Sequence, residues 1–254
     1  MCLVFLDPRK INTHTHKGDQ MNIKTIQRPT LKRKKRASKL ASAYVVEYPK
    51  FYVIFSCVHK ASTNTKTGDM IQTYFISKSR INEPKVFGSK CNSCPIVKEC
   101  YVSRDKLAVR RALKRLINGL STSYQFSTLD QVLELIKGRK LRFGTYGDPS
   151  ALPLEDVTKI TSVLTGWTGY THYWKSIDQG YSKFFMASVE SLEGELLAST
   201  LGYRFFRVLL KKDSVLESMN SIECPNSTRG ITCAQCGLCK GKSVNAKSIY
   251  IHEH

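Results

Sequence analysis

The cysteines of this sequence gather in two clusters whose spacing is typical of metal ligands. The C-terminal cluster ends in a Cys-x-x-Cys-x-x-Cys run and contains Cys224, Cys233, Cys236 and Cys239. Four thiolates satisfy either a tetrahedral zinc ion or a four-iron cluster, and the spacing does not choose between them. The Gly-Lys-Ser sequence at 241–243 does not form a phosphate-binding loop, because Cys236 stands where such a loop requires glycine.

An earlier cluster, CNSCPIVKEC at 91–100, supplies only three thiolates, from Cys91, Cys94 and Cys100. A closed structural zinc site needs a fourth ligand, and the candidates for it are Cys57, His59 and His172. With three protein ligands, a metal ion or iron–sulfur cluster would instead keep an open position, as catalytic sites do. We therefore expect either a structural zinc site or an open catalytic site here.

Charge is the second chemical signal of the chain. Its 254 residues carry a formal net charge of +20, from 40 lysines and arginines against 20 acidic residues. The excess before residue 40 has no apolar period, which predicts a disordered basic arm over 1–40. Five of its residues are expected to contact phosphates, namely Lys32, Arg33, Lys34, Lys35 and Arg36. This charge predicts a nucleic-acid partner, and a merely soluble basic surface is the plainer alternative.

A second basic concentration lies on a helix predicted at about 101–119. Its apolar residues fall at helical spacing. Lys106, Arg110 and Lys114 recur every four residues on another face of the same helix. This basic face is predicted to contact nucleic acid, although most basic helical faces are only solvated.

The sequence contains no window of about eighteen apolar residues, so we expect no membrane span. The N-terminal MCLVFLD is too short, and too soon followed by charge, to be a signal peptide. We therefore expect a cytoplasmic chain. In that reducing compartment, clustered cysteines more often bind metal than form disulfides.

Strands and helices alternate from about residue 41, which predicts a single α/β domain over 41–254. Strands are predicted from β-branched and aromatic residues within 42–57, 70–77, 141–149, 169–174, 183–190, 203–210 and 221–225, and SIYIHEH at 248–254 closes the chain. Helices are predicted at 129–137, 154–166 and 191–202, the first capped by Thr128 and Gln131 and ended by Gly138. This repetition predicts a partial or full (β/α) barrel with mostly parallel strands.

Polar side chains stand where several of these strands end. Asp148 follows one strand, Thr171 and His172 end another, and Glu190 ends a third. Since binding groups of parallel α/β folds gather at the carboxyl ends of the strands, we expect these residues and the 91–100 cysteines to share one face. Asp148 and His172 are the candidate catalytic residues. The plainer alternatives are a helix-capping Asp148 and a core histidine at 172.

Several motifs occur in a fixed order within 59–254, among them CNSCPIVKECYV, LRFGTYGDPSALP, GYTHYW, MASVES, CPNS…TCAQCGLC and IYIHEH. Together they resemble a group of phage and mobile-element proteins that includes the mycobacteriophage "gene product 88" family. That group is similar to the radical-SAM type of barrel, which implies a partial (β/α) barrel here. Radical-SAM enzymes bind their cluster through Cys-x-x-x-Cys-x-x-Cys, a spacing that the 91–100 cysteines lack, so S-adenosylmethionine does not follow from the resemblance.

Two functions fit these observations. The first is a phage or mobile-element enzyme that uses zinc or an iron–sulfur cluster in a radical-SAM-like barrel and acts on nucleic acid. The second is a non-catalytic, zinc-stapled DNA- or RNA-binding protein with a role in replication or in the virion. An initiator that nicks strands through paired histidines is disfavoured, because the His-x-His pairs at 14–16 and 252–254 lack a hydrophobic residue between them.

Overall fold

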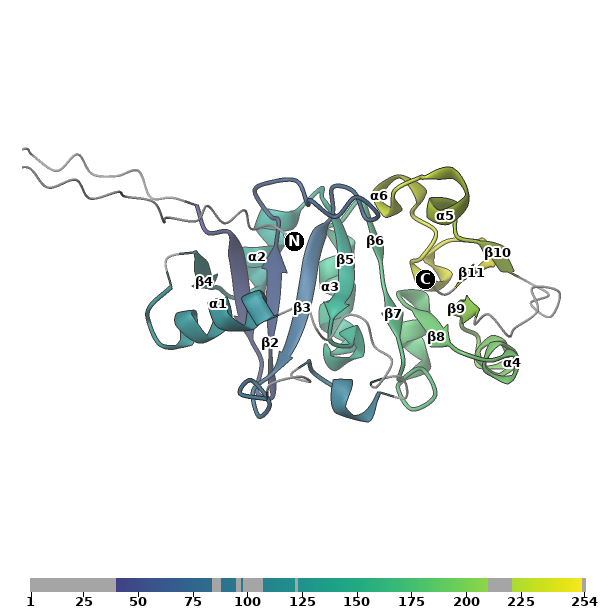
Figure 1. The fold of residues 1–254 in the computed structure, drawn as a ribbon, viewed down its shortest axis with the longest axis horizontal. Helices are drawn as coiled ribbons and strands as arrows, with labels where there is room; N and C mark the ends of the chain where they lie inside the picture. The colour runs from purple at the N-terminus through teal and green to yellow at the C-terminus, as the bar shows by residue number, and fades with distance from the viewer. Residues whose placement is uncertain are drawn as a thin grey trace, which may run out of the picture. The chain divides into compact units, whose positions relative to one another are not determined.

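The computed structural model describes residues 40–83, 88–94, 97, 107–121, 123–209 and 221–252 (Figure 1). Within these ranges the strands form two sheets, one of six strands and one of five. The predicted basic arm, apart from residue 40, lies outside the described residues, as do Cys100 and Lys106.

The first sheet is mixed, because an antiparallel meander precedes its parallel strands. Its members are β1 (Ala43–Glu47), β2 (Phe51–Ser56), β3 (Ile71–Ser77), β4 (Tyr124–Phe126), β5 (Lys140–Tyr146) and β6 (Gly166–Thr168). β1, β2 and β3 pair antiparallel in sequence order, while β4 is parallel to β1, and β5 and β6 extend the sheet parallel to β3. The near-continuous burial of β1 to β3 explains their apolar sequences, since both faces of these strands are covered.

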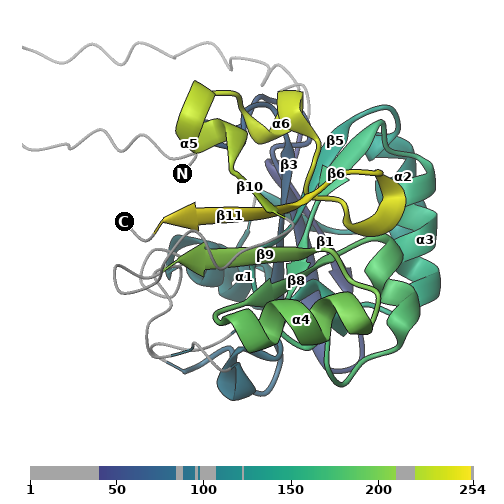
Figure 2. The ribbon, with the colours of Figure 1, turned by 90° about the vertical axis from the view of Figure 1, so that its right-hand side faces the viewer.

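The second sheet is parallel throughout its described pairings. Its strands are β7 (Tyr170–Thr171), β8 (Met186–Val189), β9 (Phe205–Leu209), β10 (Ser221–Glu223) and β11 (Ser248–His252). They stand in the order β10-β11-β9-β8-β7. Figure 2 shows β11, β9 and β8 side by side with α4 against them, and α5 and α6 beyond β10. The prediction of an α/β fold with mostly parallel strands is confirmed.

Helices connect most of the parallel strands. The α-helices are α1 (Leu107–Ile117), α2 (Leu129–Ile136), α3 (Leu154–Ser162), α4 (Leu192–Thr200), α5 (Pro225–Arg229) and α6 (Cys233–Cys236). The 3-10 helices are η1 (Cys91–Ser93), η3 (Pro149–Ala151), η4 (Gln179–Lys183) and η6 (Gly241–Ser243). The predicted capping box is present at α2, where Thr128 and Gln131 satisfy each other's backbone N–H groups. In the part of the chain that the structure describes, no helix has the length and apolar character to cross a bilayer.

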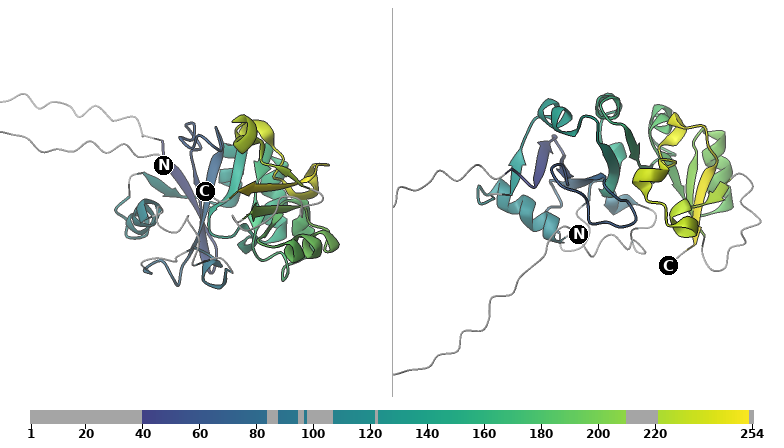
Figure 3. Two further views of the ribbon diagram at one scale, coloured as in Figure 1. Left: turned by 45° about the vertical axis from the view of Figure 1, so that its right-hand side comes forward. Right: turned by 90° about the horizontal axis from the view of Figure 1, so that it is seen from above.

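Gly169 joins the two sheets, because it stands between β6 and β7. A Cβ atom at this position would lie 2.7 Å from the ring of Phe185 and 3.1 Å from Phe143 Cβ. The backbone therefore passes from the first sheet to the second at a point where no side chain fits. Figure 3 shows the C-terminal segment, in yellow, beside the green strands of the second sheet.

The apolar side chains of the first sheet divide between its two faces. One face packs with α2 and α3, and Phe55, Phe75 and Phe143 are buried there. The other face packs with α1, whose Leu113 is fully buried against Val45 and Ile54. A smaller cluster lies on the second sheet, where Ala198 of α4 packs against Ala187 and Phe205. Both faces of the first sheet are thus covered by helices.

The structure corrects several predicted boundaries. The stretch 42–57 is two strands with a turn between them, and the helix predicted at 154–166 ends at Ser162, because Gly166 begins β6. The strand predicted at 169–174 covers only Tyr170–Thr171, and the one at 183–190 begins at Met186, after the 3-10 turn η4. Apart from the turn within 42–57, these differences are at element ends, where the assignment of a boundary is least certain from local patterns.

A full barrel is not what the described strands form. The described strands form two separate sheets, and neither end strand of the first sheet, β4 or β6, pairs with an end strand of the second, β7 or β10. The meander of β1 to β3 explains this, because antiparallel neighbours replace the strand–helix units that would close a barrel.

Candidate functional site

Asp148 is held at the carboxyl end of β5 by the turn that precedes it. Gly147 has φ +77°, and a Cβ atom on it would lie 2.3 Å from the carbonyl oxygen of Phe75, so only glycine fits there. The chain then turns into η3, and Asp148 Oδ1 accepts from the backbone N–H of Ser150 at 3.0 Å. The capping role that the sequence offered as the plainer alternative is therefore present.

The same carboxylate also ties β5 to β7. Asp148 Oδ1 accepts from Ser150 Oγ at 2.7 Å and from Thr171 Oγ1 at 2.9 Å, and Oδ2 accepts from the backbone N–H of His172 at 2.9 Å. Burial raises the pKa of Asp148, but the hydrogen bonds from His172 and Ser150 outweigh burial and lower it below the ordinary value. The side chain is thus a buried carboxylate that links two strand ends.

His172 lies between this carboxylate and a cysteine. Its Nδ1 is 3.8 Å from Asp148 Oδ2, while Nε2 is buried and has no hydrogen-bond partner among the described residues. Burial lowers the pKa of the ring, but the neighbouring Asp148 carboxylate and Cys94 thiol outweigh burial and raise the pKa to about 10. The structure therefore brings together Asp148, His172 and Cys94, and we call these three residues with Cys91 the strand-end cluster.

The segment that carries Cys91 and Cys94 is packed tightly against the strand ends. A Cβ atom on Gly88 would lie 2.5 Å from Cys91 Sγ and 3.0 Å from the ring of Tyr146, so this glycine permits the approach. Lys90 has φ +63°, and its ammonium donates to the carbonyl oxygen of Ser150 at 2.9 Å and to Ser150 Oγ at 3.0 Å. A left-handed backbone at a lysine persists only where the surroundings hold it.

Tyr173, which follows β7, contacts the same cysteine segment through its hydroxyl and its ring. Its hydroxyl donates to the carbonyl oxygen of Lys90, and the Lys90 ammonium lies 4.9 Å from the centre of the ring. Ser93 Oγ also hydrogen-bonds the Tyr173 hydroxyl. The first cysteine segment is therefore fixed to both β5 and β7, as expected from its place after a strand.

The other candidates for the fourth ligand of this segment lie elsewhere. His59 Nε2 is 2.7 Å from the hydroxyl of Tyr44 and packs against that ring. Cys57 is buried, with φ +62°. Of the three candidates, His172 is the one beside Cys94.

The four C-terminal cysteines surround one small void, which we call the four-cysteine cavity. It has a volume of about 20 Å³ and is lined by all four thiol-bearing residues, Cys224, Cys233, Cys236 and Cys239. Apolar side chains complete the wall, among them Ile231, Leu238 and Ile249. Burial raises the pKa of the Cys239 thiol to about 12, although the hydrogen bond from Tyr170 opposes this.

Local sequence explains how these cysteines are presented. Cys233 and Cys236 begin and end the single turn of α6, which has a capping box from Thr232 and Gln235. Gly237 follows in the left-handed conformation, at φ +64°, and turns the chain toward Cys239. The spacing Cys-x-x-Cys-x-x-Cys therefore corresponds to one helical turn followed by one reversal.

Backbone hydrogen bonds fix the four-cysteine segment to both sheets. The N–H of Cys233 donates to the carbonyl of Lys66 at 3.0 Å, and the N–H of Cys224 donates to the carbonyl of Tyr250 at 2.9 Å. The N–H of Gly169 donates to the carbonyl of Cys239 at 2.9 Å. The segment is thus attached to the loop before β3, to β11 and to the junction between the sheets.

Whether these residues fit a metal is decided by their donor chemistry and surroundings. No three His, Cys, Asp or Glu side chains within the described ranges converge closely enough to hold a single ion. The strand-end cluster offers a buried imidazole nitrogen without a hydrogen bond, and the four-cysteine cavity offers thiols whose burial disfavours ionisation. Both donor sets suit thiophilic metals, which deprotonate a coordinating thiol.

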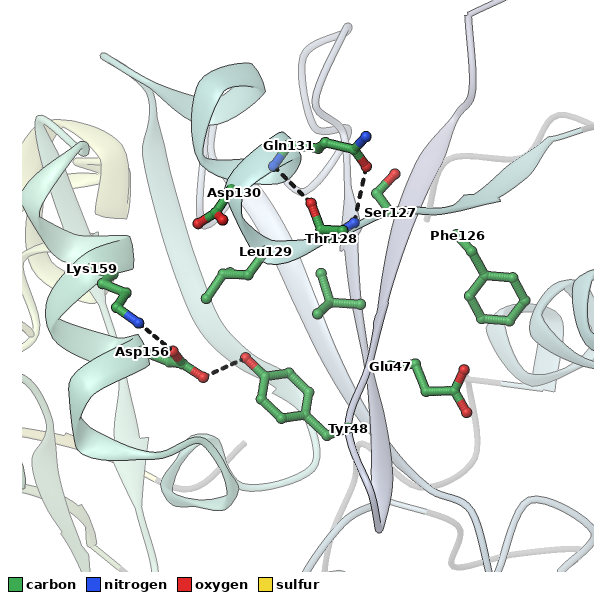
Figure 4. Close-up of a pocket in the computed structure, with 11 residues that line it drawn as sticks. Glu47, Tyr48, Phe126, Ser127, Thr128, Leu129, Asp130, Gln131, Asp156 and Lys159 are labelled. Carbon is green, nitrogen blue, oxygen red and sulfur yellow. Dashed lines mark hydrogen bonds and ion pairs between the residues drawn. The ribbon is translucent and has the colours of Figure 1, made fainter.

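A larger cavity has a lining that includes none of the cysteines of the two cysteine sites. It has a volume of about 680 Å³ and lies beside the end of β1, the start of α2 and α3 (Figure 4). The Tyr48 hydroxyl donates to Asp156 Oδ2 at 2.8 Å, and the Lys159 ammonium is 3.5 Å from Asp156 Oδ1. These polar groups satisfy one another, and none of the predicted site residues lines the cavity. Its size alone therefore does not mark a working site.

The basic residues predicted to contact nucleic acid are only partly described. Lys114 is exposed on α1, and Arg111 and Arg115 of the same helix are exposed with it. Arg110 is half-buried and donates to the carbonyl of Glu83. The predictions for Lys106 and for the run from Lys32 to Arg36 lie outside the described residues.

Sequence reasoning missed several residues of these sites. It predicted no role for Lys90 and Ser150 next to the strand-end cluster, or for Tyr170 beside Cys239, although Ser150 lies within LRFGTYGDPSALP and Tyr170 within GYTHYW. Their positions depend on how strands far apart in the sequence pair. Tyr170 could have been identified from the sequence, because it immediately precedes Thr171 and His172 on a strand whose end was predicted to carry site residues.

The comparisons with family models, curated proteins and solved structures found no match to this chain.

Proposed function

We propose that this chain is a metal-dependent protein that acts on nucleic acid, with its working site at the carboxyl ends of β5 and β7. Cys91, Cys94 and His172 are the proposed ligands, with Asp148 orienting the imidazole ring; because the three side chains do not converge on one point in the structure, they would have to close around the metal as it binds. The observation that carries the proposal is the buried Nε2 of His172, which has no hydrogen-bond partner among the described residues while the Cys94 thiol lies beside the ring.

The carboxylate of Asp148 supports this assignment. A histidine that ligates a metal usually offers its other ring nitrogen to a carboxylate or carbonyl, which fixes the ring and raises its basicity. Nδ1 of His172 faces Asp148 Oδ2 at 3.8 Å, and a small rotation of the ring would bring the two within hydrogen-bonding distance. A metal held there would supply a Lewis acid for a phosphoryl or carbonyl oxygen.

The connection between the two sheets supports a working site at the ends of β5 and β7. We infer that the two sheets are parts of one open barrel, joined at Gly169, in which strand ends of both sheets face the bound substrate. Glu190, at the end of β8, interacts electrostatically with His172 across the sheet. Residues at the ends of β5, β7 and β8 therefore lie at or near one site.

Charge supports nucleic acid as the substrate. A net charge of +20 attracts phosphates over long range, and Arg111, Lys114 and Arg115 expose a basic surface on α1. The basic arm adds further cations in sequence directly before β1. These groups bind phosphates without reading bases.

A non-catalytic, metal-stapled nucleic-acid-binding protein is the second candidate. The four-cysteine cavity favours it, because the segment is fixed by backbone bonds to the loop before β3, to β11 and to Gly169. A metal bound by these four cysteines would stabilise the fold whether or not the strand-end cluster catalyses a reaction.

The experiment compares the wild type with His172→Gln and with Asp156→Asn, a buried carboxylate at the large cavity. Each chain is purified without oxygen and offered single- and double-stranded oligonucleotides; mass spectrometry reads chemical change and fluorescence anisotropy reads binding. We expect His172→Gln to form no product while its Kd for the oligonucleotides changes by less than about twofold. Asp156→Asn should form product and bind the oligonucleotides as the wild type does. Equal product from wild type and His172→Gln contradicts the working site. Tight binding without any product from the wild type favours the second candidate.

A further inference from the structure

An aromatic and basic surface that the proposed working site does not use lies around Trp167 of β6. The Trp167 side chain is half-buried, because part of it packs against the core of the first sheet. Its Nε1 donates to the carbonyl oxygen of Phe184 at 2.9 Å, which orients the ring. A tryptophan whose orientation is fixed is thus partly open to solvent.

Two lysines accompany this ring and its aromatic neighbour. The Lys240 ammonium lies 5.8 Å from the centre of the Trp167 ring, and the Lys183 ammonium lies 5.5 Å from the centre of the Phe184 ring. The centres of the two rings are 6.3 Å apart. Phe184 itself is buried, so we give the name Trp167 surface to Trp167, Lys183 and Lys240.

The Gly-Lys-Ser sequence that fails as a phosphate loop holds this surface together. Gly241 has φ +58°, and a Cβ atom on it would lie 2.5 Å from the carbonyl oxygen of Ser182 in η4. Ser243 Oγ also donates to the carbonyl oxygen of Lys183 at 2.6 Å. Because only glycine permits the first contact, η6 packs directly against η4 and brings the preceding Lys240 to the same surface.

The charge of this surface is not neutralised by acidic side chains. The segments 157–177 and 224–252, which supply Trp167 and Lys240, contain no aspartate or glutamate. Asp178, which precedes η4, caps it by accepting from the N–H of Gly180 at 2.6 Å. Among the described residues, neither lysine of the surface forms an ion pair. Both ammonium groups are therefore available to an anionic partner.

We propose that the Trp167 surface binds single-stranded nucleic acid, with a base stacked on Trp167 and phosphates on Lys183 and Lys240. Proteins that bind single strands combine cations along the backbone with aromatic rings on which bases stack. Bases within a duplex are stacked on one another and do not offer their faces to a side chain, so such a surface selects single strands.

This surface is separate from the proposed working site. Trp167 pairs with Leu141 at the start of β5, whereas Asp148 and the strand-end cluster follow the end of that strand. The inference rests on the proposed action on nucleic acid and specifies the form of nucleic acid that the chain holds. It assigns the Trp167 surface a role in binding and none in the reaction.

The test uses the fluorescence of the full chain, whose two tryptophans differ in exposure. Trp174 is only 2% exposed, so a stacked base reaches Trp167 alone. The probes are an oligo-dT of about 16 nucleotides, within the range of single-strand-binding sites, and the same strand in a duplex. We expect the single strand to quench the wild type and Trp174→Phe but not Trp167→Phe, which keeps an aromatic ring against the core. The duplex should quench none of them.

A double variant, Lys183→Gln with Lys240→Gln, tests the phosphate contacts. Fluorescence anisotropy should show that the slope of log K for the single strand against log salt falls by about 0.7 for each phosphate no longer neutralised. Lys159→Gln, whose ammonium is paired with Asp156, is the control and should keep the slope of the wild type.

Quenching that persists in Trp167→Phe, or that the duplex produces equally, overturns the proposal, as does an unchanged slope in the double variant. A wild type that binds the single strand without quenching refutes this surface and leaves the proposed function standing. A wild type that binds neither oligonucleotide contradicts both.

Discussion

The carboxylate of Asp148 holds His172 in two ways, accepting its backbone N–H at 2.9 Å and facing its ring Nδ1 at 3.8 Å. The same carboxylate accepts from Thr171 Oγ1 and Ser150 Oγ, so one buried side chain sets the geometry of two strand ends. This relationship makes Asp148 a positioning residue for the metal that we assign to Cys91, Cys94 and His172.

Replacing Asp148 with Asn should weaken metal binding at the strand-end cluster without removing a ligand. Changing a carboxylate that orients a metal-ligating histidine costs roughly 10- to 100-fold in metal affinity. The measurement is a cobalt titration followed by the visible absorption of thiolate-bound Co²⁺, with the four-cysteine set already loaded. Asp156→Asn, which changes a carboxylate bonded to Tyr48, is the control and should leave the affinity unchanged. An Asp148→Asn chain that binds cobalt as tightly as the wild type would refute the orienting role.

The basic face of α1 should contribute to nucleic-acid binding through phosphates alone. Changing Arg111, Lys114 and Arg115 to Ala should weaken binding to all sequences alike and reduce the slope of log K against log salt by about 0.9 for each duplex phosphate that the variant no longer neutralises. Anisotropy titrations at several salt concentrations measure this slope. Lys159→Ala on α3, where the ammonium is paired with Asp156, should leave the slope as it is. A triple variant with an unaltered slope would exclude α1 from the interface.

The ion pair between Arg207 and Glu195 should be a major determinant of stability. Arg207 Nη1 donates to Glu195 Oε1 at 3.0 Å, and both side chains are almost completely buried between β9 and α4. Glu195→Ala leaves the guanidinium charged and without this partner, so the free energy of unfolding should fall by about 3–5 kcal/mol. Urea denaturation followed by far-ultraviolet circular dichroism measures this loss.

The matched control is Glu47→Ala, which removes an ion pair with Lys78 at the surface. Because water screens that pair, its loss should cost no more than about 1 kcal/mol. If Glu195→Ala and Glu47→Ala lowered the free energy of unfolding by similar amounts, the buried ion pair would contribute no more to stability than the surface pair.

Metal removal should destabilise the C-terminal part of the fold. Cys236→Ser and a wild-type chain treated with a strong metal chelator should unfold at similar, lowered temperatures, because both would lack the metal proposed for the four cysteines that line the cavity beside α5 and α6. Adding the chelator to Cys236→Ser should then change little. Differential scanning calorimetry reads these transitions, and a large further drop for the treated variant would mean that the chelator acts elsewhere.

Much of the strand-end cluster could be predicted because its signals are local. Asp148 and His172 stand directly after strands that β-branched and aromatic residues indicate, and parallel strand ends meet at one edge. The capping box of Thr128 and Gln131 is likewise encoded within four residues. Patterns of this kind need no knowledge of which strands pair.

The remainder depends on tertiary pairing, which no local pattern encodes. Between β6 and β7, the ring of Phe185 and the Cβ atom of Phe143 leave no space for a side chain on Gly169, whereas the sequence shows only an ordinary glycine before a tyrosine. Lys90 meets Ser150 across 60 residues for the same reason. The order of strands also decides against a closed barrel, although strand–helix alternation alone permits one.

Native mass spectrometry of the full chain, purified without oxygen, tests the central claim most directly. We expect the mass of the chain plus metal at the four cysteines Cys224, Cys233, Cys236 and Cys239 and one further metal ion, with the first missing from Cys236→Ser and the second missing from His172→Gln. A wild-type chain that has the bare polypeptide mass under these reducing conditions would contradict the metal dependence proposed for this protein.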